Sequence, residues 1–432
     1  MKFDQAMTKV LCDLLPCLPD GILMGINHCG IDSWAETVMN VTPEMVDGYM
    51  TAIEAAGFKK HDESAVRENR FATHVNAEGF AVYSTYMPWN KTLCVAVDGP
   101  ERYTVLCDWQ SEGDRNSKKV CETTLSQIGL CFNLAEGISP FDLEGKPGPD
   151  FTGGQFNIIR LEDGSLIVID GGHWRDENGD LVYTMLRKHA PDPDNIVVAA
   201  WIFTHAHADH VLAFVNFSPR YGDKIKVERF IHNLIYAGDI NMNRTLDTIA
   251  QYYPDSQRII GHAGQIYHIR NAEMKIYCCY ELVHPCDISW GNEASLVFSI
   301  EVAGKKTMFL ADMGPKQNKV IRMMYTTEEF KSDFLQVAHH GWNGGHLKVN
   351  EMVAPDYVLF NGTTAPLDAS WNTYFFEKYT YSSGVVEFRK RDHIKELYRA
   401  IEGVEYFILR EGEEPEAKVY QTHQEFFNAD LA

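Results

Sequence analysis

The chain has 432 residues, and one domain usually takes about 100–200, so two or three compact units are expected. Apolar residues make up 45% and charged residues 23%, a globular composition that excludes a disordered or fibrous chain. The formal charge is −21, from 39 Lys and Arg against 60 Asp and Glu. Such an acidic surface repels phosphate backbones, which disfavours a partner that is a long nucleic acid.

The N-terminal residues MKFDQAMTKVLCDLLPCLPDG contain acidic residues and prolines before any long apolar stretch, which predicts neither a signal peptide nor a membrane anchor. No apolar run reaches the roughly 18 residues of a membrane span. The ten cysteines form no CxxC pair, so reduced thiols are expected. We therefore expect a cytoplasmic protein with no membrane partner. Its oligomeric state stays open.

Residues 1–149 predict a small α+β domain. Thr42 can cap a helix that has Pro43 in its first turn, and Gly57 can end it. Extended stretches then follow around residues 71–75, 80–86 and 92–97, which predicts a helix packed on an antiparallel meander. No cluster of metal-binding or nucleophilic residues in this domain indicates its role.

Residues 150–432 predict a second, larger domain after a linker rich in Gly and Pro at 145–156. Strands and helices alternate there, which indicates an α/β layer fold. The basic run RKRDHIKELYR at 389–399 predicts a helix with one solvated face. The predicted strands of this domain cover residues 165–170, 195–204, 295–302, 305–312, 334–338 and 357–360.

The strongest chemical signal is the segment Thr204-His-Ala-His-Ala-Asp-His210, which follows the apolar strand ending at Phe203. Residues two apart in an extended stretch point the same way, so His205 and His207 can converge on one cation. Asp209 and His210 can face a second cation as the chain turns into a helix. Imidazoles with carboxylates suit zinc, iron or manganese rather than calcium.

This segment and its surroundings resemble the metallo-β-lactamase superfamily, over roughly residues 150–365. The hallmark of that family is His-x-His-x-Asp-His. Asp170-Gly-Gly upstream, Asp312 at the end of its strand, and Val337-Ala-His-His-Gly341 downstream match further motifs in the same order. The stretch Asn292-Glu-Ala-Ser-Leu-Val297, with His-His-Gly, looks most like the branch of ComEC nuclease-like domains and phosphorylcholine esterases. The resemblance implies a four-layer αββα sandwich, here preceded by the small α+β domain.

The resemblance also implies a ligand set for two divalent ions, with Asp312 bridging them. Two positions stay open. The family often has a histidine where this chain has Gly291-Asn292. Either the nearby His284 completes the first site, or that site has one protein ligand fewer or recruits Asn292. Either His339 or His340 binds metal, and the following glycine favours His340, which leaves His339 as an acid or a substrate contact. Asp170 is expected to orient a ligand. The predicted metal ligands are His205, His207, Asp209, His210, His284, Asp312 and His340.

The expected activity is that of a metal-dependent hydrolase acting on a small molecule. Two divalent ions, zinc first but with manganese or iron also suitable, would activate water, and Asp209 would orient it. The expected reaction is hydrolysis of a phosphodiester or a related ester. The alternatives are an acyl hydrolase of the same fold (lactone, thioester or β-lactam) and a non-enzymatic scaffold that metal stabilises. His207 argues against an oxygen-reducing di-iron relative, which usually has a carboxylate there.

Overall fold

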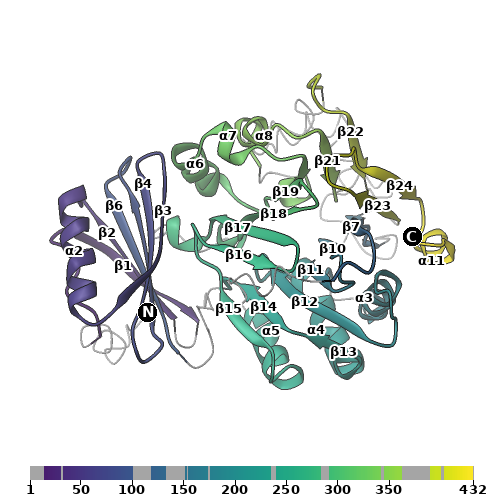
Figure 1. The fold of residues 1–432 in the computed structure, drawn as a ribbon, viewed down its shortest axis with the longest axis horizontal. Helices are drawn as coiled ribbons and strands as arrows, with labels where there is room; N and C mark the ends of the chain where they lie inside the picture. Colours follow the sequence, from purple (N-terminus) through teal and green to yellow (C-terminus); the bar gives the residue numbers. More distant parts are fainter. Residues whose placement is uncertain are drawn as a thin grey trace, which may run out of the picture.

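The computed structural model describes residues 14–30, 33–100, 118–132, 151–152, 154–173, 176–234, 240–283, 291–341, 345–361, 390–399 and 403–431. Within them the strands form sheets of six, nine, seven and two strands. The six-stranded sheet lies apart from the large pair of sheets, at the N-terminal end of the ribbon (Figure 1).

The N-terminal sheet is antiparallel and carries helix α2 (Pro43–Ala55) on its outer face (Figure 1). Thr42 caps α2 by accepting a hydrogen bond from the backbone N–H of Met45 at 3.4 Å, and Gly57, with a φ of 96°, follows the helix. The apolar side of α2 packs on the sheet. The predicted helix and the three predicted strands of this domain are thus confirmed. In sheet order the strands are β1 (Ile22–Gly30), β2 (Ser33–Met39), β6 (Thr92–Asp98), β5 (Ala81–Met87), β4 (Asn69–Val75) and β3 (Lys59–Val66).

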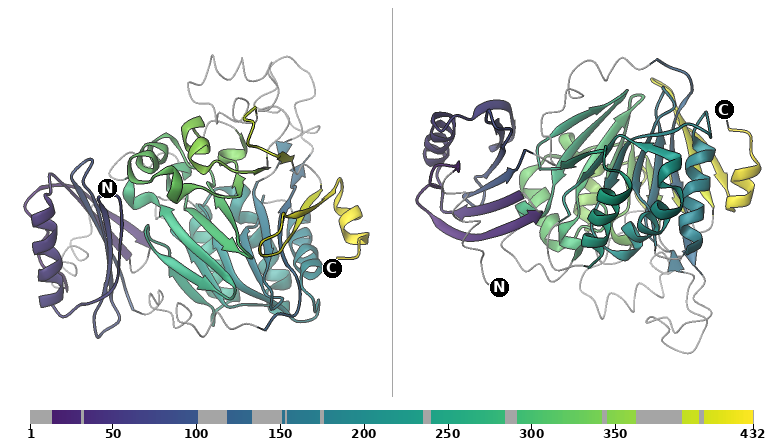
Figure 2. Two further views of the ribbon diagram at one scale, coloured as in Figure 1. Left: turned by 45° about the horizontal axis from the view of Figure 1, so that its top comes forward. Right: turned by 90° about the horizontal axis from the view of Figure 1, so that it is seen from below.

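The nine-stranded sheet has helices α3 (Asp176–His189), α4 (Ala208–Tyr221) and α5 (Ile240–Tyr252) along one face (Figures 1 and 2). Trp201, Phe214 and Phe230 belong to the buried core between this sheet and its helices. Its strands are β15 (Gln257–Ile260), β14 (Arg229–His232), β12 (Ile196–Phe203), β11 (Leu166–Asp170), β10 (Phe156–Arg160), β7 (Thr123–Ile128), β23 (Val404–Leu409) and β24 (Glu416–Tyr420), with β13 (Ile225–Val227) paired to β12.

The seven-stranded sheet packs on the other face of the nine-stranded sheet and carries helices α6 (Pro315–Met324), α7 (Thr327–Phe330) and α8 (Leu347–Val353) on its far side. One apolar core fills the space between the two sheets. The layers are helix, sheet, sheet, helix, which confirms the predicted αββα fold. The strands are β16 (Ile266–Ile269), β17 (Ala272–Cys278), β18 (Val297–Val302), β19 (Lys305–Phe309), β20 (Phe334–Gln336), β21 (Tyr357–Phe360) and β22 (Glu396–Arg399).

Strand β7 pairs with β10 and β23, so by its hydrogen bonds it belongs to the nine-stranded sheet. It precedes residue 149, where we predicted the domain boundary. The linker predicted at 145–156 lies largely outside the described residues. Of its described part, Phe151–Thr152 forms strand β9, which pairs with β8 (Cys131–Phe132). The last helix of the described chain is α11 (His423–Asn428).

The helix predicted at 389–399 is wrong, because Glu396–Arg399 forms strand β22 parallel to β21. Ile394 and Leu397 do pack against the core between the sheets, as the helix prediction required. A short edge strand places these two apolar side chains against the core as well as the predicted helix would. Among the described residues no helix is long and apolar enough to cross a membrane, and the five cysteines whose side chains are described are free thiols.

Candidate metal centre

The His-x-His-x-Asp-His segment lies at the carboxyl end of β12, where the chain turns into α4. His207 takes the N-cap position of α4 with extended backbone angles, and Asp209 is in the first turn. A carboxylate there faces the positive end of the helix. The backbone N–H of Gly171 donates to the His210 carbonyl at 2.8 Å, which fixes the helix start against the end of β11.

Asp312 and the His339-His340 pair reach the same place from the other sheet. Asp312 follows β19, and the two histidines follow β20, which runs parallel to β19. The carboxyl ends of parallel neighbours meet at one edge of a sheet, so the three side chains come together. The backbone N–H of His339 donates to the Ala311 carbonyl at 2.9 Å and links the two strand ends.

The side chains form two groups that share Asp312. His205, His207 and Asp312 make one group, and Asp209, His210, Asp312 and His340 make the other; within each, the candidate ligand atoms lie within 4.8 Å of one another. Asp312 Oδ2 lies 3.7 Å from His205 Nε2, whereas Oδ1 lies 3.4 Å from His210 Nε2 and 3.6 Å from His340 Nε2. Each carboxylate oxygen therefore faces a different group, as a bridging ligand requires.

The second group has the spacing of atoms around one ion. His340 Nε2 lies 3.2 Å from Asp209 Oδ2, and His210 Nε2 lies 3.9 Å from the same oxygen. Two atoms bound to one zinc ion at about 2.0–2.2 Å can be at most about 4.4 Å apart. Both distances lie within this limit.

Asp170 and Thr204 orient the imidazole rings of His205 and His210 through their Nδ1 atoms. Asp170 accepts hydrogen bonds from the Thr204 backbone N–H and hydroxyl, both at 2.8 Å, and its Oδ2 lies 2.8 Å from His210 Nδ1. Since the Thr204 hydroxyl donates its proton to Asp170, its oxygen accepts from His205 Nδ1 at 3.1 Å. This network places a proton on Nδ1 of both histidines and turns their Nε2 atoms toward Asp312. This is the orienting position predicted for Asp170.

Several buried atoms of this cluster have no hydrogen-bond partner. They are Nε2 of His205 and His210, both ring nitrogens of His340, and Oδ1 of Asp312. All four side chains are nearly inaccessible to solvent. Buried polar atoms without partners are costly and rare, and the atoms left over are those that bind transition metals. The donor set therefore fits divalent cations.

The pKa directions divide the histidines of this centre. Against the effect of burial, the neighbouring carboxylates raise the pKa of His210 and of His340, so a bound cation has to displace a proton from these two rings. Burial alone raises the pKa of Asp312, but the neighbouring His210, His340 and His339 outweigh it and hold that pKa well below its ordinary value. Burial also lowers the pKa of His205, and the adjacent His210 and His207 lower it further. An ionised carboxylate beside neutral imidazole is the protonation state in which both bind metal.

Left-handed backbone conformations gather at this centre. Outside glycine, φ is 57° at Asp170, 49° at Ala311, 49° at His339 and 52° at His340, and Gly341 continues the run with 80°. Such conformations are uncommon for residues with a Cβ, and they persist where the surroundings enforce them. Here they turn the chain sharply at the strand ends that present the ligands.

The structure brings together every predicted ligand that it describes. His284 lies outside the described residues. His340 is in the second group, whereas His339 lies outside both groups, with its Nε2 3.8 Å from Asp312 Oδ2 and 3.2 Å from the Asn292 side-chain nitrogen. His339 is 24% exposed and Asn292 lies beside it, at the open side of the first group. Their roles as ligands or catalytic groups stay predictions.

Two glycines that hold the site together were not singled out in the sequence. A Cβ at Gly291 would lie 2.4 Å from His207 Nε2, and one at Gly154, whose φ is 89°, would lie 1.6 Å from the Asp209 carbonyl oxygen. Only glycine lets these two segments approach the ligands so closely. The paired glycines at 153–154 were a possible signal, but the pattern predicted a linker there.

The fold is a four-layer αββα sandwich, and the described residues place a candidate dinuclear metal centre at the carboxyl ends of its strands. No protein-family model and no curated protein matches the sequence. Among solved structures, the metallo-β-lactamase fold protein YhfI from Bacillus subtilis is similar at 13% identity, over 55% of this chain and 85% of that chain, with a TM-score of 0.34.

Two other solved structures show the same kind of likeness. The diiron β-hydroxylase CmlA from Streptomyces venezuelae has 11% identity over 78% of this chain and 70% of that one, with a TM-score of 0.33. A metallo-β-lactamase from Cronobacter sakazakii has 12% identity over 45% of this chain and 78% of that one, with a TM-score of 0.26.

Proposed function

We propose that the protein is a dinuclear-metal hydrolase of small phosphodiesters or related esters. The proposal rests on the orientation of the Asp312 carboxylate. Its Oδ1 and Oδ2 atoms face separate groups of buried imidazole nitrogens. A purely structural carboxylate would satisfy those nitrogens by hydrogen bonds, yet they have none.

Three side chains at the centre, Asp209, His339 and Asn292, have separate roles in the proposed hydrolysis. Divalent cations bound here would supply Lewis-acid polarisation and a lowered pKa for water. Asp209, whose side chain is 32% exposed, orients that water and accepts a hydrogen bond from it. His339 is the accessible imidazole on the Oδ2 side, so it contacts the substrate and hydrogen-bonds to the oxygen on which negative charge develops. Asn292 positions the His339 ring.

The preference for a phosphodiester rests on the resemblance of the Asn292–Val297 and His-His-Gly motifs to a phosphodiester-cleaving branch. An acyl hydrolase would use the same ligands with a different pocket. Zinc is the proposed metal because catalytic zinc sites use imidazole and carboxylate ligands, and manganese and iron satisfy the same donor set.

Metal content tests the centre itself. We expect close to two transition-metal ions per chain by elemental analysis of the purified protein, and at least one ion fewer in His207→Ala. His61→Ala, which changes an exposed histidine of the N-terminal domain, is the matched control and should keep the full content. Equal metal content in wild type and His207→Ala would defeat the proposal.

Substrate panels test the reaction. Metal-loaded protein is expected to hydrolyse bis-(p-nitrophenyl) phosphate, and the rate should fall on addition of a chelator and return with metal. Hydrolysis of ester or lactone panels alone would assign the acyl chemistry instead. Two bound ions without turnover of any panel would support the non-enzymatic scaffold.

A further inference from the structure

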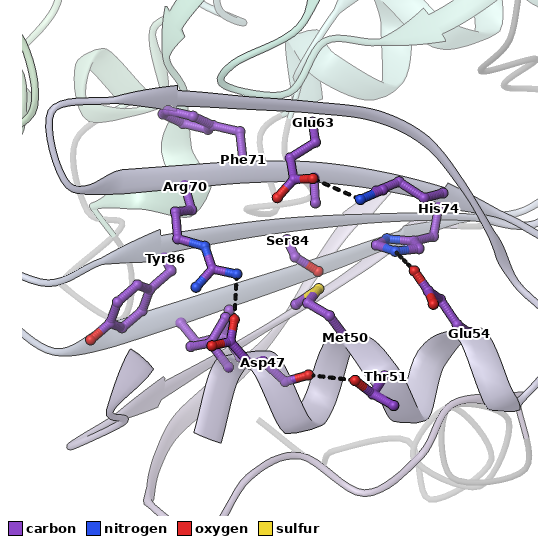
Figure 3. Close-up of a pocket in the computed structure, with 14 residues that line it drawn as sticks. Asp47, Met50, Thr51, Glu54, Glu63, Arg70, Phe71, His74, Ser84 and Tyr86 are labelled. Carbon is purple, nitrogen blue, oxygen red and sulfur yellow. Dashed lines mark hydrogen bonds and ion pairs between the residues drawn. The ribbon is translucent and has the colours of Figure 1, made fainter. Parts of the chain in front are cut away.

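A second site candidate lies on the N-terminal domain, far along the chain from the metal ligands. A groove of about 220 Å³ runs between helix α2 and strands β3 and β4, with β5 contributing to its floor (Figure 3). It belongs to the face of the sheet that α2 covers only in part. The proposed hydrolysis uses none of its residues.

The hollow arises from small side chains at the centre of the floor. Ala72 on β4 and Ser84 on β5 are paired directly across the sheet. On the same face, Arg70 is paired with Tyr86 on one side of them, and His74 lies on the other side. Large residues therefore flank a pair of small ones, which leaves space beneath α2 that packing does not fill.

Two polar side chains at the bottom of this hollow are buried without hydrogen-bond partners. Neither ring nitrogen of His74 nor the hydroxyl of Ser84 has one, although the two side chains are only about 1% and 3% exposed. Figure 3 shows both pointing from the sheet toward α2. An unpartnered hydroxyl and imidazole cost stability in the empty protein, and a ligand in the groove would supply the partners.

One carboxylate at the groove, Glu54, is half exposed and forms no ion pair with a lysine or arginine among the described residues, although Lys60 is near enough to interact with it electrostatically. Arg70 pairs with Asp47 at 2.7 Å, and Lys60 pairs with Glu63 at 2.8 Å. Among the described residues, Glu54 has only His74 as an ion-pair partner, with 3.8 Å between Oε1 and Nε2 (Figure 3). Burial lowers the pKa of His74, so this imidazole is neutral near pH 7 and does not compensate Glu54.

We propose that the groove binds a small primary amine that carries a hydroxyl or carbonyl group next to its ammonium group. The ammonium group pairs with Glu54. The neighbouring polar group hydrogen-bonds to His74 and Ser84, each of which offers both a donor and an acceptor. Met50 and Tyr86 supply apolar contact for the carbon skeleton. The net charge of −21 also favours the approach of a cationic ligand.

The test is a titration of the metal-loaded full-length protein with 2-aminoethanol, followed by ligand-observed NMR. Ethane-1,2-diol and glycolate are the neutral and anionic probes of similar size. We expect saturable binding of the amine only. Glu54→Gln, which keeps the shape of the side chain, should weaken it about tenfold or more, because a hydrogen bond to a charged group is lost. Glu68→Gln, an exposed glutamate outside the groove, is the matched control and should change nothing.

Ser84→Ala gives a second, independent readout. Removing an unpartnered buried hydroxyl should leave the melting temperature of the ligand-free protein unchanged or raise it, while the amine binds several-fold more weakly. The proposal is overturned if wild type binds no amine, if glycolate binds better, or if Glu54→Gln binds as wild type does. Binding that survives Glu54→Gln but is lost in Asp312→Ala would place the amine at the metal centre and also overturn it.

Discussion

Among the described residues, two buried clusters of histidine and carboxylate can be compared, and they differ in whether their imidazole nitrogens and carboxylate oxygens have hydrogen-bond partners. The metal centre follows β12, and its Nε2 atoms and one Asp312 oxygen have none. The other cluster follows β15, where His262 contacts Asp98 of the N-terminal sheet at 2.7 Å through Nε2 and Glu281 at 2.9 Å through Nδ1.

The second cluster is complete without any ion. Ser33 donates to Asp98 at 2.6 Å, and the Asn233 side chain donates to Glu281 at 2.8 Å. Tyr83 stacks on the His262 ring with 3.8 Å between centroids. A single imidazolium thus pairs with two carboxylates, and these contacts join the N-terminal sheet to the sandwich. The same residue types thus serve as a structural joint in one place and as a candidate metal site in the other, and the unpartnered atoms distinguish them.

The largest expected effect is at the metal centre. Asp312→Ala removes the carboxylate shared by both groups, so we expect hydrolysis to fall by more than about 100-fold, beyond the loss typical of a residue that only supports a ligand. The fold should survive, as judged by circular dichroism, because the remaining core is untouched. Asp192→Ala, at an exposed turn, is the control. Normal turnover by Asp312→Ala would contradict the proposed bridging role of Asp312.

At the joint, the large effect should be on stability. His262→Ala leaves the buried Asp98 and Glu281 carboxylates facing each other without a cation, which costs about 3–5 kcal/mol. Urea unfolding measures this, and metal content should be unchanged in the folded variant. By contrast, His207→Ala in metal-free protein should change the unfolding free energy by no more than about 1 kcal/mol. Equal losses in the two variants would erase the distinction between the clusters.

The joint also predicts a dependence of stability on pH. Burial alone lowers the pKa of His262, but the Glu281 and Asp98 carboxylates outweigh it and raise the pKa to about 10. A folded-state pKa above the unfolded value of about 6.5 gives stability that is complete below pH 6.5 and is lost as pH rises toward 10, by at most about 1.4 kcal/mol per pH unit. Urea titrations between pH 6.5 and 10 should show this fall in wild type, and a much smaller one in His262→Ala.

The smallest expected effect comes from a single methyl group. Gly291→Ala places a Cβ against His207 Nε2, so the loop or the ring must shift. We expect metal affinity at the first group to fall about tenfold, within the range for residues that support ligands, with little change in the second group. Competition with a chromophoric chelator measures it. Gly48→Ala, on the open face of α2, is the matched control, since its Cβ would meet nothing within 4 Å.

The sequence by itself determined an alternating α/β layer fold, the helix and meander of the N-terminal domain, and the strand-end positions of the candidate ligands. These follow from local signals: apolar strands, a capped helix, and four ligand-type residues within Thr204–His210. It misassigned the edge strand Glu396–Arg399, because a short amphipathic run satisfies a helix and an edge strand alike.

Only the tertiary structure decided how residues distant in sequence meet. Strand β7 joins the large sheet across the predicted domain boundary, and Asp312 turns one oxygen to each group. Asp98 and His262, 164 positions apart, meet in the joint. No local pattern encodes such pairings, because each member alone has the features of an ordinary buried polar residue. Only the positions of the hydrogen-bond partners distinguish the structural joint from the candidate metal site.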